Sequence, residues 1–168
     1  FFYKRGMERD AEGREYADNG HRAIFFARGV LETVKKLRWA PDVVVCQGWM
    51  AAVVPAYMNK AYCDEPCFAN TKVVTTLFAN RIKGEFTPDT KQSVAFNNVT
   101  AETLAAYDDN FDITQLLRLA VDYSDGVCVA EAGVDADIVA YAEGKSLPLL
   151  NYSPENTCES YHDFFENL

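Results

Sequence analysis

The sequence predicts an α/β fold, a three-layer Rossmann-like domain in which a mainly parallel sheet lies between helices. Apolar, mostly β-branched runs recur at Val43–Cys46, Val73–Leu77 and Val127–Ala130. None of them alternates apolar with polar residues, which is typical of strands buried on both faces. Segments with helical spacing of apolar residues separate the runs. This alternation predicts parallel strands joined by right-handed crossovers.

The composition agrees with one domain of ordinary size. The chain has 168 residues, and 49% of them are hydrophobic, which is enough for a sizeable core. Its net charge of −9 argues against a surface for nucleic acid or an anionic membrane, because such surfaces need clustered Lys and Arg. No stretch approaches the ~20 apolar residues of a membrane-spanning helix. Neither nucleic acid nor a membrane is therefore expected as a partner.

The cysteines and histidines predict neither a metal site nor a disulfide framework. Five cysteines at irregular spacing suit free thiols in a reducing cytoplasm, which is the expected location. Cys63 and Cys67 lie close in sequence, but no second pair of Cys or His completes a tetrahedral site. The glycine-rich phosphate loops and the serine elbow are also absent from the sequence. We therefore expect no metal and no cofactor.

Helices are expected between and around the strands. The first follows a polar loop and spans residues 20–37, with Asp18 or Asn19 as its cap and an Arg28–Glu32 pair on its surface. A short fourth strand at 147–150 is expected at a sheet edge, because Pro148 lacks the N–H of an inner strand. Further helices are expected at 50–62, from Thr87-Pro88 onward, through 113–123, at 134–142 and from Pro154-Glu155 onward.

Polar and aromatic residues follow the predicted strands. Ligands of open parallel sheets bind beyond the carboxyl ends of the strands, so the loops after these strands are the candidate site. An aromatic ring beside amides and charges suits a sugar, which has apolar faces and hydroxyl edges. For Trp49 the alternative is packing within the second helix. The predicted substrate-binding residues are Gln47, Trp49, Asn80, Lys83 and Glu131.

Several motifs resemble those of glycogen and starch synthases. Residues 18–37 resemble the family helix "DNxxRxxFFxRxxLExxKxL", residues 41–49 resemble "PDIIHCHDW", and Val53–Tyr57 is similar to "LVPxYL". Thr76, Gly84 and Phe86 fit "TIHNLAYQGVF", and residues 124–127 fit the start of "ADAVTTVSP". The likeness is stronger from Asp18 to Tyr57 than beyond. The matching helix positions are Asp18, Asn19, Arg22, Phe25, Phe26, Arg28, Leu31, Glu32, Lys35 and Leu37.

The resemblance implies a glycosyltransferase domain of α-glucan metabolism. Enzymes of this family transfer glucose from a nucleotide sugar to an α-glucan, so ADP-glucose and α-glucan are the implied ligands. The family has the GT-B architecture of two Rossmann-like halves. Residues 1–168 are expected to form a single amino-terminal domain that lacks its first strands, as in a short single-domain subgroup.

The departures from the family pattern concern its active site. The family's His-Asp pair is Gln47-Gly48 here, and its active-site His falls on Phe78. The Lys-x-Gly-Gly loop and the second domain are not found in these residues. We therefore assign no catalytic residue and expect no glucosyl transfer by this chain alone. The alternatives are a module that binds glucan or a protein, a synthase half completed by a protein partner that supplies a second domain, and a structural or assembly domain.

Overall fold

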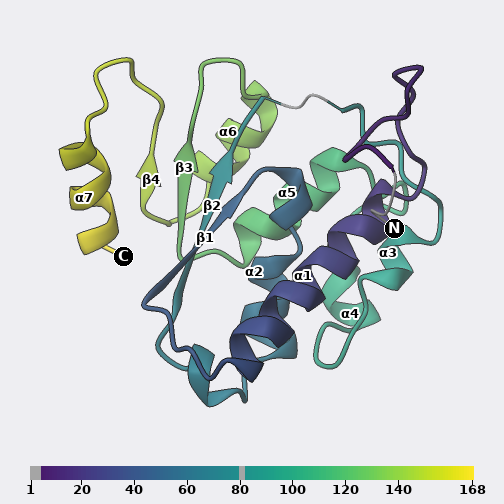
Figure 1. Cartoon of the computed structure of the whole chain (residues 1–168). Coiled ribbons are helices and arrows are strands. Elements are labelled where there is room, and N and C mark those ends of the chain that lie inside the picture. Colours follow the sequence, from purple (N-terminus) through teal and green to yellow (C-terminus); the bar gives the residue numbers. More distant parts are fainter. Residues whose placement is uncertain (1–4, 80–81) are drawn as a thin grey trace.

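The computed structural model describes residues 5–79 and 82–168, and it shows a parallel sheet flanked by helices (Figure 1). The strands lie in sequence order, and each of the three pairings is parallel. Their carboxyl ends consequently meet at one edge of the sheet. The predicted α/β class and parallel pairing are confirmed. The strands are β1 (Val43–Gln47), β2 (Lys72–Leu77), β3 (Gly126–Val129) and β4 (Leu149–Leu150).

The predicted helix at 50–62 is a series of short helical pieces. A 3-10 turn, η1 (Trp49–Ala51), leads into α2 (Val54–Ala56) and a π-helical turn, η2 (Tyr57–Ala61). Pro55 lies in the first turn of α2, where its missing N–H is tolerated, so a helix continuous through this position is disfavoured. The other helical elements are α1 (Asn19–Lys36), η3 (Pro66–Phe68), α3 (Thr90–Ser93), α4 (Ala101–Leu104), α5 (Ile113–Asp122), α6 (Ala136–Glu143) and α7 (Cys158–Glu166).

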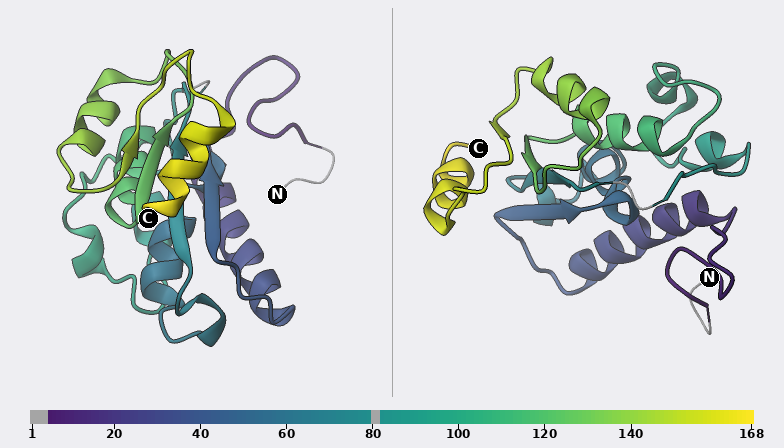
Figure 2. Two further views of the ribbon diagram at one scale, coloured as in Figure 1. Left: turned by 90° about the vertical axis from the view of Figure 1, so that its left-hand side faces the viewer. Right: turned by 90° about the horizontal axis from the view of Figure 1, so that it is seen from above.

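Both faces of the sheet are covered by apolar side chains. Val73, Leu77 and Val127 belong to a large cluster that includes residues of α1, α2, α5 and α6. Val74 and Cys128 pack instead against Phe164 of α7. Figure 2 shows α7 at one end of the sheet and α1 at the other. Successive residues of β2 thus enter different clusters, as expected for a strand buried on both faces.

Asp18 occupies the cap position of α1, as expected, and the helix begins within one residue of the predicted start. The side chain of Asp18, at the cap position, makes no capping hydrogen bond, because Arg5 binds its carboxylate at 3.0 Å. Asn19 is the first residue of the helix itself. The expected surface pair on α1 is also replaced: Arg28 lies over the Phe96 ring, and Glu32 accepts a hydrogen bond from the Tyr62 hydroxyl at 2.8 Å.

The last helix begins later than expected. Pro154 lies in a turn, and α7 starts at Cys158. Thr157 accepts a hydrogen bond from the main-chain N–H of Ser160 and completes a capping box, so it fixes the start of the helix. In the described ranges, no helix is both long and apolar enough to cross a membrane.

Candidate functional site

A small pocket lies at the carboxyl edge of the sheet, after β1, β2 and β3. Its volume is ≈ 200 Å³. Trp49, the first residue of η1, lines the pocket, and so does Glu131, which lies in the loop after β3. The pocket therefore collects side chains from segments that are far apart in sequence. The lining residues are Glu8, Gly48, Trp49, Phe78, Ala79, Leu117 and Glu131.

Two carboxylates and an indole ring give the pocket its polar character. The half-buried Trp49 donates from its indole Nε1–H to Glu8 Oε2 over a long 3.4 Å. Glu131 Oε1 accepts the main-chain N–H of Ala79 at 2.8 Å, which ties the loop after β3 to the end of β2. Glu8, Trp49 and Glu131 thus converge from three segments on one small space.

The structure brings together two of the five residues predicted to bind substrate, Trp49 and Glu131. Gln47 is exposed and lines a different groove, beside α1. Lys83 is exposed, and it is not among the residues that line the pocket. Asn80 lies outside the described residues. The involvement of these five residues in binding stays a prediction.

Glu8 is a site residue that the sequence analysis did not identify. It belongs to the amino-terminal loop, in which Arg9 and Glu15 form an antiparallel bridge. The loop turns around Gly13, whose N–H donates to the carbonyl of Asp10 at 3.0 Å. No periodicity in this polar segment predicts that it reaches the sheet edge. The one sequence feature that could have pointed to Glu8 is the motif at the start of α1, because residues of this motif hold the loop.

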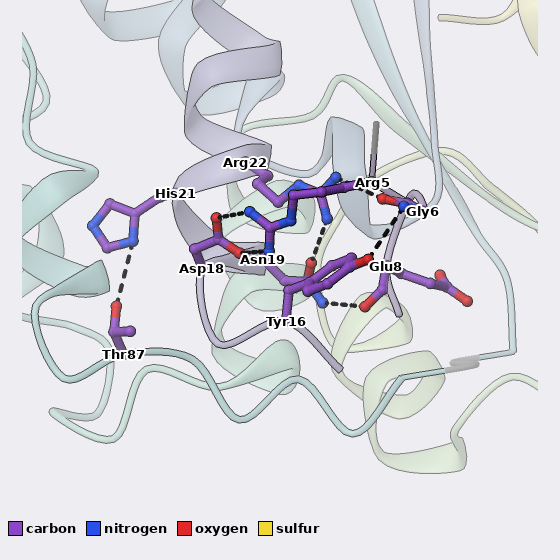
Figure 3. Close-up of polar contacts among 9 residues, drawn as sticks. All are labelled: Arg5, Gly6, Glu8, Tyr16, Asp18, Asn19, His21, Arg22 and Thr87. Atoms are coloured by element: carbon purple, nitrogen blue, oxygen red, sulfur yellow. Dashed lines mark hydrogen bonds and ion pairs between the residues drawn. The ribbon is translucent and has the colours of Figure 1, made fainter. Parts of the chain in front are cut away.

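Arg22 and Asn19 of that motif bind the loop directly (Figure 3). Arg22 is buried, and its guanidinium donates to the carbonyl of Gly6 at 2.9 Å and to Asn19 Oδ1 at 3.3 Å. The Asn19 amide in turn donates to the main-chain carbonyl of Glu8 at 3.0 Å. The first turn of α1 therefore positions the residue that contacts Trp49.

Tyr16 and the Arg5–Asp18 pair strengthen the same attachment. Arg5 binds the Asp18 carboxylate through two hydrogen bonds, of 3.0 and 3.1 Å. The guanidinium carbons of Arg5 and Arg22 lie 4.0 and 4.9 Å from the centre of the Tyr16 ring. Partial burial opposes ionisation of Asp18, but the hydrogen bonds and charge of Arg5 outweigh it and lower the pKa of this carboxyl.

The loop also binds the segment that follows β2. Glu15 accepts the main-chain N–H groups of Lys83 at 2.8 Å and Gly84 at 3.0 Å. Gly84 has a φ of +67°, and a Cβ at this position would lie 2.4 Å from Cβ of Ile113. Only glycine fits here, so the match of Gly84 to the family motif has a structural reason.

The pocket chemistry favours hydroxyl donors over phosphates. Ionised carboxylates only accept hydrogen bonds, and a sugar offers several O–H donors to Glu8 and Glu131. No Lys or Arg is among the lining residues. Phe78, which stands where the family has its active-site His, is 38% exposed and offers only an apolar ring. The arrangement thus offers hydrogen-bond acceptors beside an aromatic ring, with no acid or base at the position of Phe78.

Comparison with known proteins identifies the family. A family model for the starch synthase catalytic domain matches residues 1–150. The chain is 34% identical over 89 residues to a glycogen synthase of Clostridium perfringens, a match that covers 53% of this chain and 17% of that protein. It is 31% identical over 99 residues to a glycogen synthase of Elusimicrobium minutum, covering 59% of this chain and 20% of that protein.

A glycogen synthase of Thermodesulfovibrio yellowstonii is 39% identical over 72 residues, which cover 43% of this chain and 14% of that protein. The matches thus span a fifth or less of the length of these relatives. The family match, in contrast, includes α1, all four strands and every residue that lines the pocket. The chain belongs to the family of starch synthase catalytic domains.

Proposed function

We propose that residues 1–168 form part of the amino-terminal half of a glycogen/starch synthase-like glycosyltransferase of α-glucan metabolism. In this proposal they are a single domain that lacks its first strands, located in the cytoplasm. The pocket of Glu8, Trp49 and Glu131 binds a glucose unit of the α-glucan. The observation that carries the proposal is a small pocket lined by an indole ring and two carboxylates at the carboxyl edge of a synthase-family sheet.

The size and charge of the pocket favour the glucan over the nucleotide sugar. Its ≈ 200 Å³ is small beside the roughly 300–1,000 Å³ of typical ligand pockets, so it suits one sugar ring rather than ADP-glucose as a whole. A diphosphate would also meet the like charges of Glu8 and Glu131. The donor therefore needs groups from elsewhere, such as a second domain on a protein partner.

Glucosyl transfer by this chain alone is not expected. Charge that develops in a transition state needs positioned polar groups around it. Phe78 cannot donate or accept a hydrogen bond, and Gly48 has no side chain where the family has Asp. The Trp49 pocket thus has groups that can bind a sugar, but at Gly48 and Phe78 it has no polar side chain that could act on the sugar.

An incorporation assay tests this proposal. Purified protein is incubated with radiolabelled ADP-glucose or UDP-glucose and a glycogen primer, and the label retained by glycogen is measured. We expect no incorporation above a blank, together with retention of the protein in a glycogen-containing native gel. Trp49→Ala should abolish that retention, and Trp39→Ala should not. Incorporation that disappears in Trp49→Ala would show a competent enzyme, and the absence of retention would favour a structural or assembly role.

A further inference from the structure

Phe78 is a large aromatic residue that the core of the fold does not use. It directly follows β2, in which residues 73–77 are all buried, yet its own side chain is 38% exposed. In the described part of the chain, neither of the two apolar clusters includes Phe78. Its side chain instead lines the Trp49 pocket. A phenylalanine kept out of the core forgoes part of the free energy of burial, which points to a role at the pocket.

The backbone on both sides of Phe78 is fixed by hydrogen bonds. The carbonyl of Leu77 accepts from Ala130 N–H at 2.9 Å. The N–H of Ala79 donates to Glu131 Oε1 at 2.8 Å. Both bonds attach the end of β2 to the segment that follows β3, and the second uses a carboxylate that itself lines the pocket. The main chain therefore holds Phe78 in place at the pocket.

Trp49 and Phe78 occupy equivalent places beyond two neighbouring strands. Gln47 of β1 is the register partner of Thr76 of β2. Trp49 and Phe78 each lie two residues beyond this pair. Gly48 N–H donates to the carbonyl of Thr76 at 3.2 Å, which keeps the chain that leads to Trp49 beside β2. Because neighbouring strands are only about 4.8 Å apart, the two aromatic side chains can line one pocket of ≈ 200 Å³.

The pocket thus combines two aromatic rings with two carboxylates. Aromatic faces suit the C–H bonds of a sugar ring, and the carboxylates of Glu8 and Glu131 suit its O–H donors. In glucose the ring hydroxyls are equatorial, so they project from the edge of the ring and leave its faces apolar. In galactose the C4 hydroxyl is axial and projects from one face. Against an aromatic ring this hydroxyl would lose its water without gaining a partner.

We propose that Phe78 stacks on the sugar ring together with Trp49, and that the pocket thereby selects glucose over a sugar with an axial C4 hydroxyl. The position at which the family has a His provides an apolar binding face in this chain. This role rests on the proposed function, because it needs a sugar in the Trp49 pocket. Since the pocket has room for one ring, a single glucose unit makes the contact.

Two glycosides that differ only at C4 test the proposal. Methyl α-D-glucopyranoside and methyl α-D-galactopyranoside are each titrated into ¹⁵N-labelled protein, and the indole N–H signal of Trp49 is followed. We expect the glucoside to bind roughly tenfold more tightly, because the axial hydroxyl loses a hydrogen bond to water. Nuclear Overhauser effects should connect the C–H protons of the glucoside to the Phe78 ring. Equal affinities for the two glycosides, or binding of maltoheptaose but of neither glycoside, would overturn the proposal.

Variants separate the role of Phe78 from the proposed function. Phe78→Leu keeps an apolar side chain without a flat ring, so it should lower the affinity for the glucoside about threefold to tenfold and reduce the preference over the galactoside. Phe78→Tyr keeps the ring and should retain both. Phe26→Ala is the matched control, because Phe26 is also 38% exposed but lines the groove beside α1. Full affinity in Phe78→Leu would overturn the stacking role alone, whereas a Trp49 signal that responds to no sugar would overturn the proposed function as well.

Discussion

The guanidinium of Arg22 donates a hydrogen bond to the main-chain carbonyl of Gly6 at 2.9 Å, from a side chain that is 0% exposed. This contact fastens the amino-terminal loop to α1, and the loop presents Glu8 to Trp49. The Asp-Asn-Arg motif is thus a support for the candidate site. Asp18 of this motif occupies the expected cap position but makes no capping hydrogen bond.

Loss of the Arg22 contacts should destabilise the fold. Arg22→Met leaves the amide oxygen of the buried Asn19, and the carbonyl of Gly6, without this donor. We expect a loss of about 2–4 kcal/mol in the free energy of unfolding, measured with urea. The control is Arg14→Met, whose side chain is 74% exposed and which should change stability by less than about 0.5 kcal/mol. Equal stabilities for the two variants would contradict the anchoring role.

Removal of the Glu8 carboxylate should weaken glucan binding while the fold is kept. One hydrogen bond to a charged group contributes about 1.5–3 kcal/mol, so Glu8→Ala should lower the affinity for maltoheptaose roughly tenfold or more. Glu12→Ala is the matched control, because Glu12 lies in the same loop with its side chain 66% exposed. Calorimetric titration measures both. An unchanged affinity in Glu8→Ala would remove Glu8 from the site.

Substitution of two glycines by alanine should change the stability of the fold in opposite directions. Gly48 has φ +69° and ψ −179°, a region open essentially to glycine alone, so Gly48→Ala should cost about 1–3 kcal/mol. Gly29 lies within α1 with nothing within 4 Å of an added Cβ, and Gly29→Ala should stabilise by up to about 1 kcal/mol. Urea midpoints measure both. A neutral Gly48→Ala would show that the backbone there relaxes readily, and that the family's Asp could be restored without strain.

The cysteines should divide into reactive and protected classes. Burial raises the pKa of Cys46 to about 12 and of Cys128 to about 11, from an ordinary 9.0. Because the thiol form is favoured in the folded state, this contribution to stability is complete below pH 9.0 and is lost as the pH rises toward 11–12.

Iodoacetamide near neutral pH should therefore label the exposed Cys63 and Cys158 first, as measured by mass spectrometry. Cys46 and Cys128 should react only after unfolding. Rapid labelling of Cys46 in the folded protein would contradict its burial in the core.

The strands were predictable because continuous β-branched runs have few uses other than in a buried sheet. Trp49 and Glu131 were also predictable, because both follow strands whose carboxyl ends meet. Gln47 does not line the pocket of Trp49 but the groove beside α1. It shares the side-chain face of the exposed Val45, since side chains alternate along a strand.

Glu8 could not be found from pattern alone. The position of Glu8 depends on Arg22 and Asn19, which hold a loop without any periodic pattern. The spacing of residues along the helix is the same whether they bind this loop, cap the helix or form a pair on its surface. The residue identities matched the family motif, but the reason for them emerges only from the contacts with Gly6 and Glu8.

The indole signals of the two tryptophans test the sugar pocket most directly. Trp49 lies in the pocket, and Trp39 lies at the far end of α1, so the two N–H signals report different surfaces of one sample. Maltoheptaose is added to ¹⁵N-labelled protein, and both indole resonances are followed. We predict a saturable shift of the Trp49 signal that is lost in Glu131→Ala, with the Trp39 signal unchanged. A Trp49 signal that stays fixed at saturating sugar, or a shift confined to Trp39, would contradict the account.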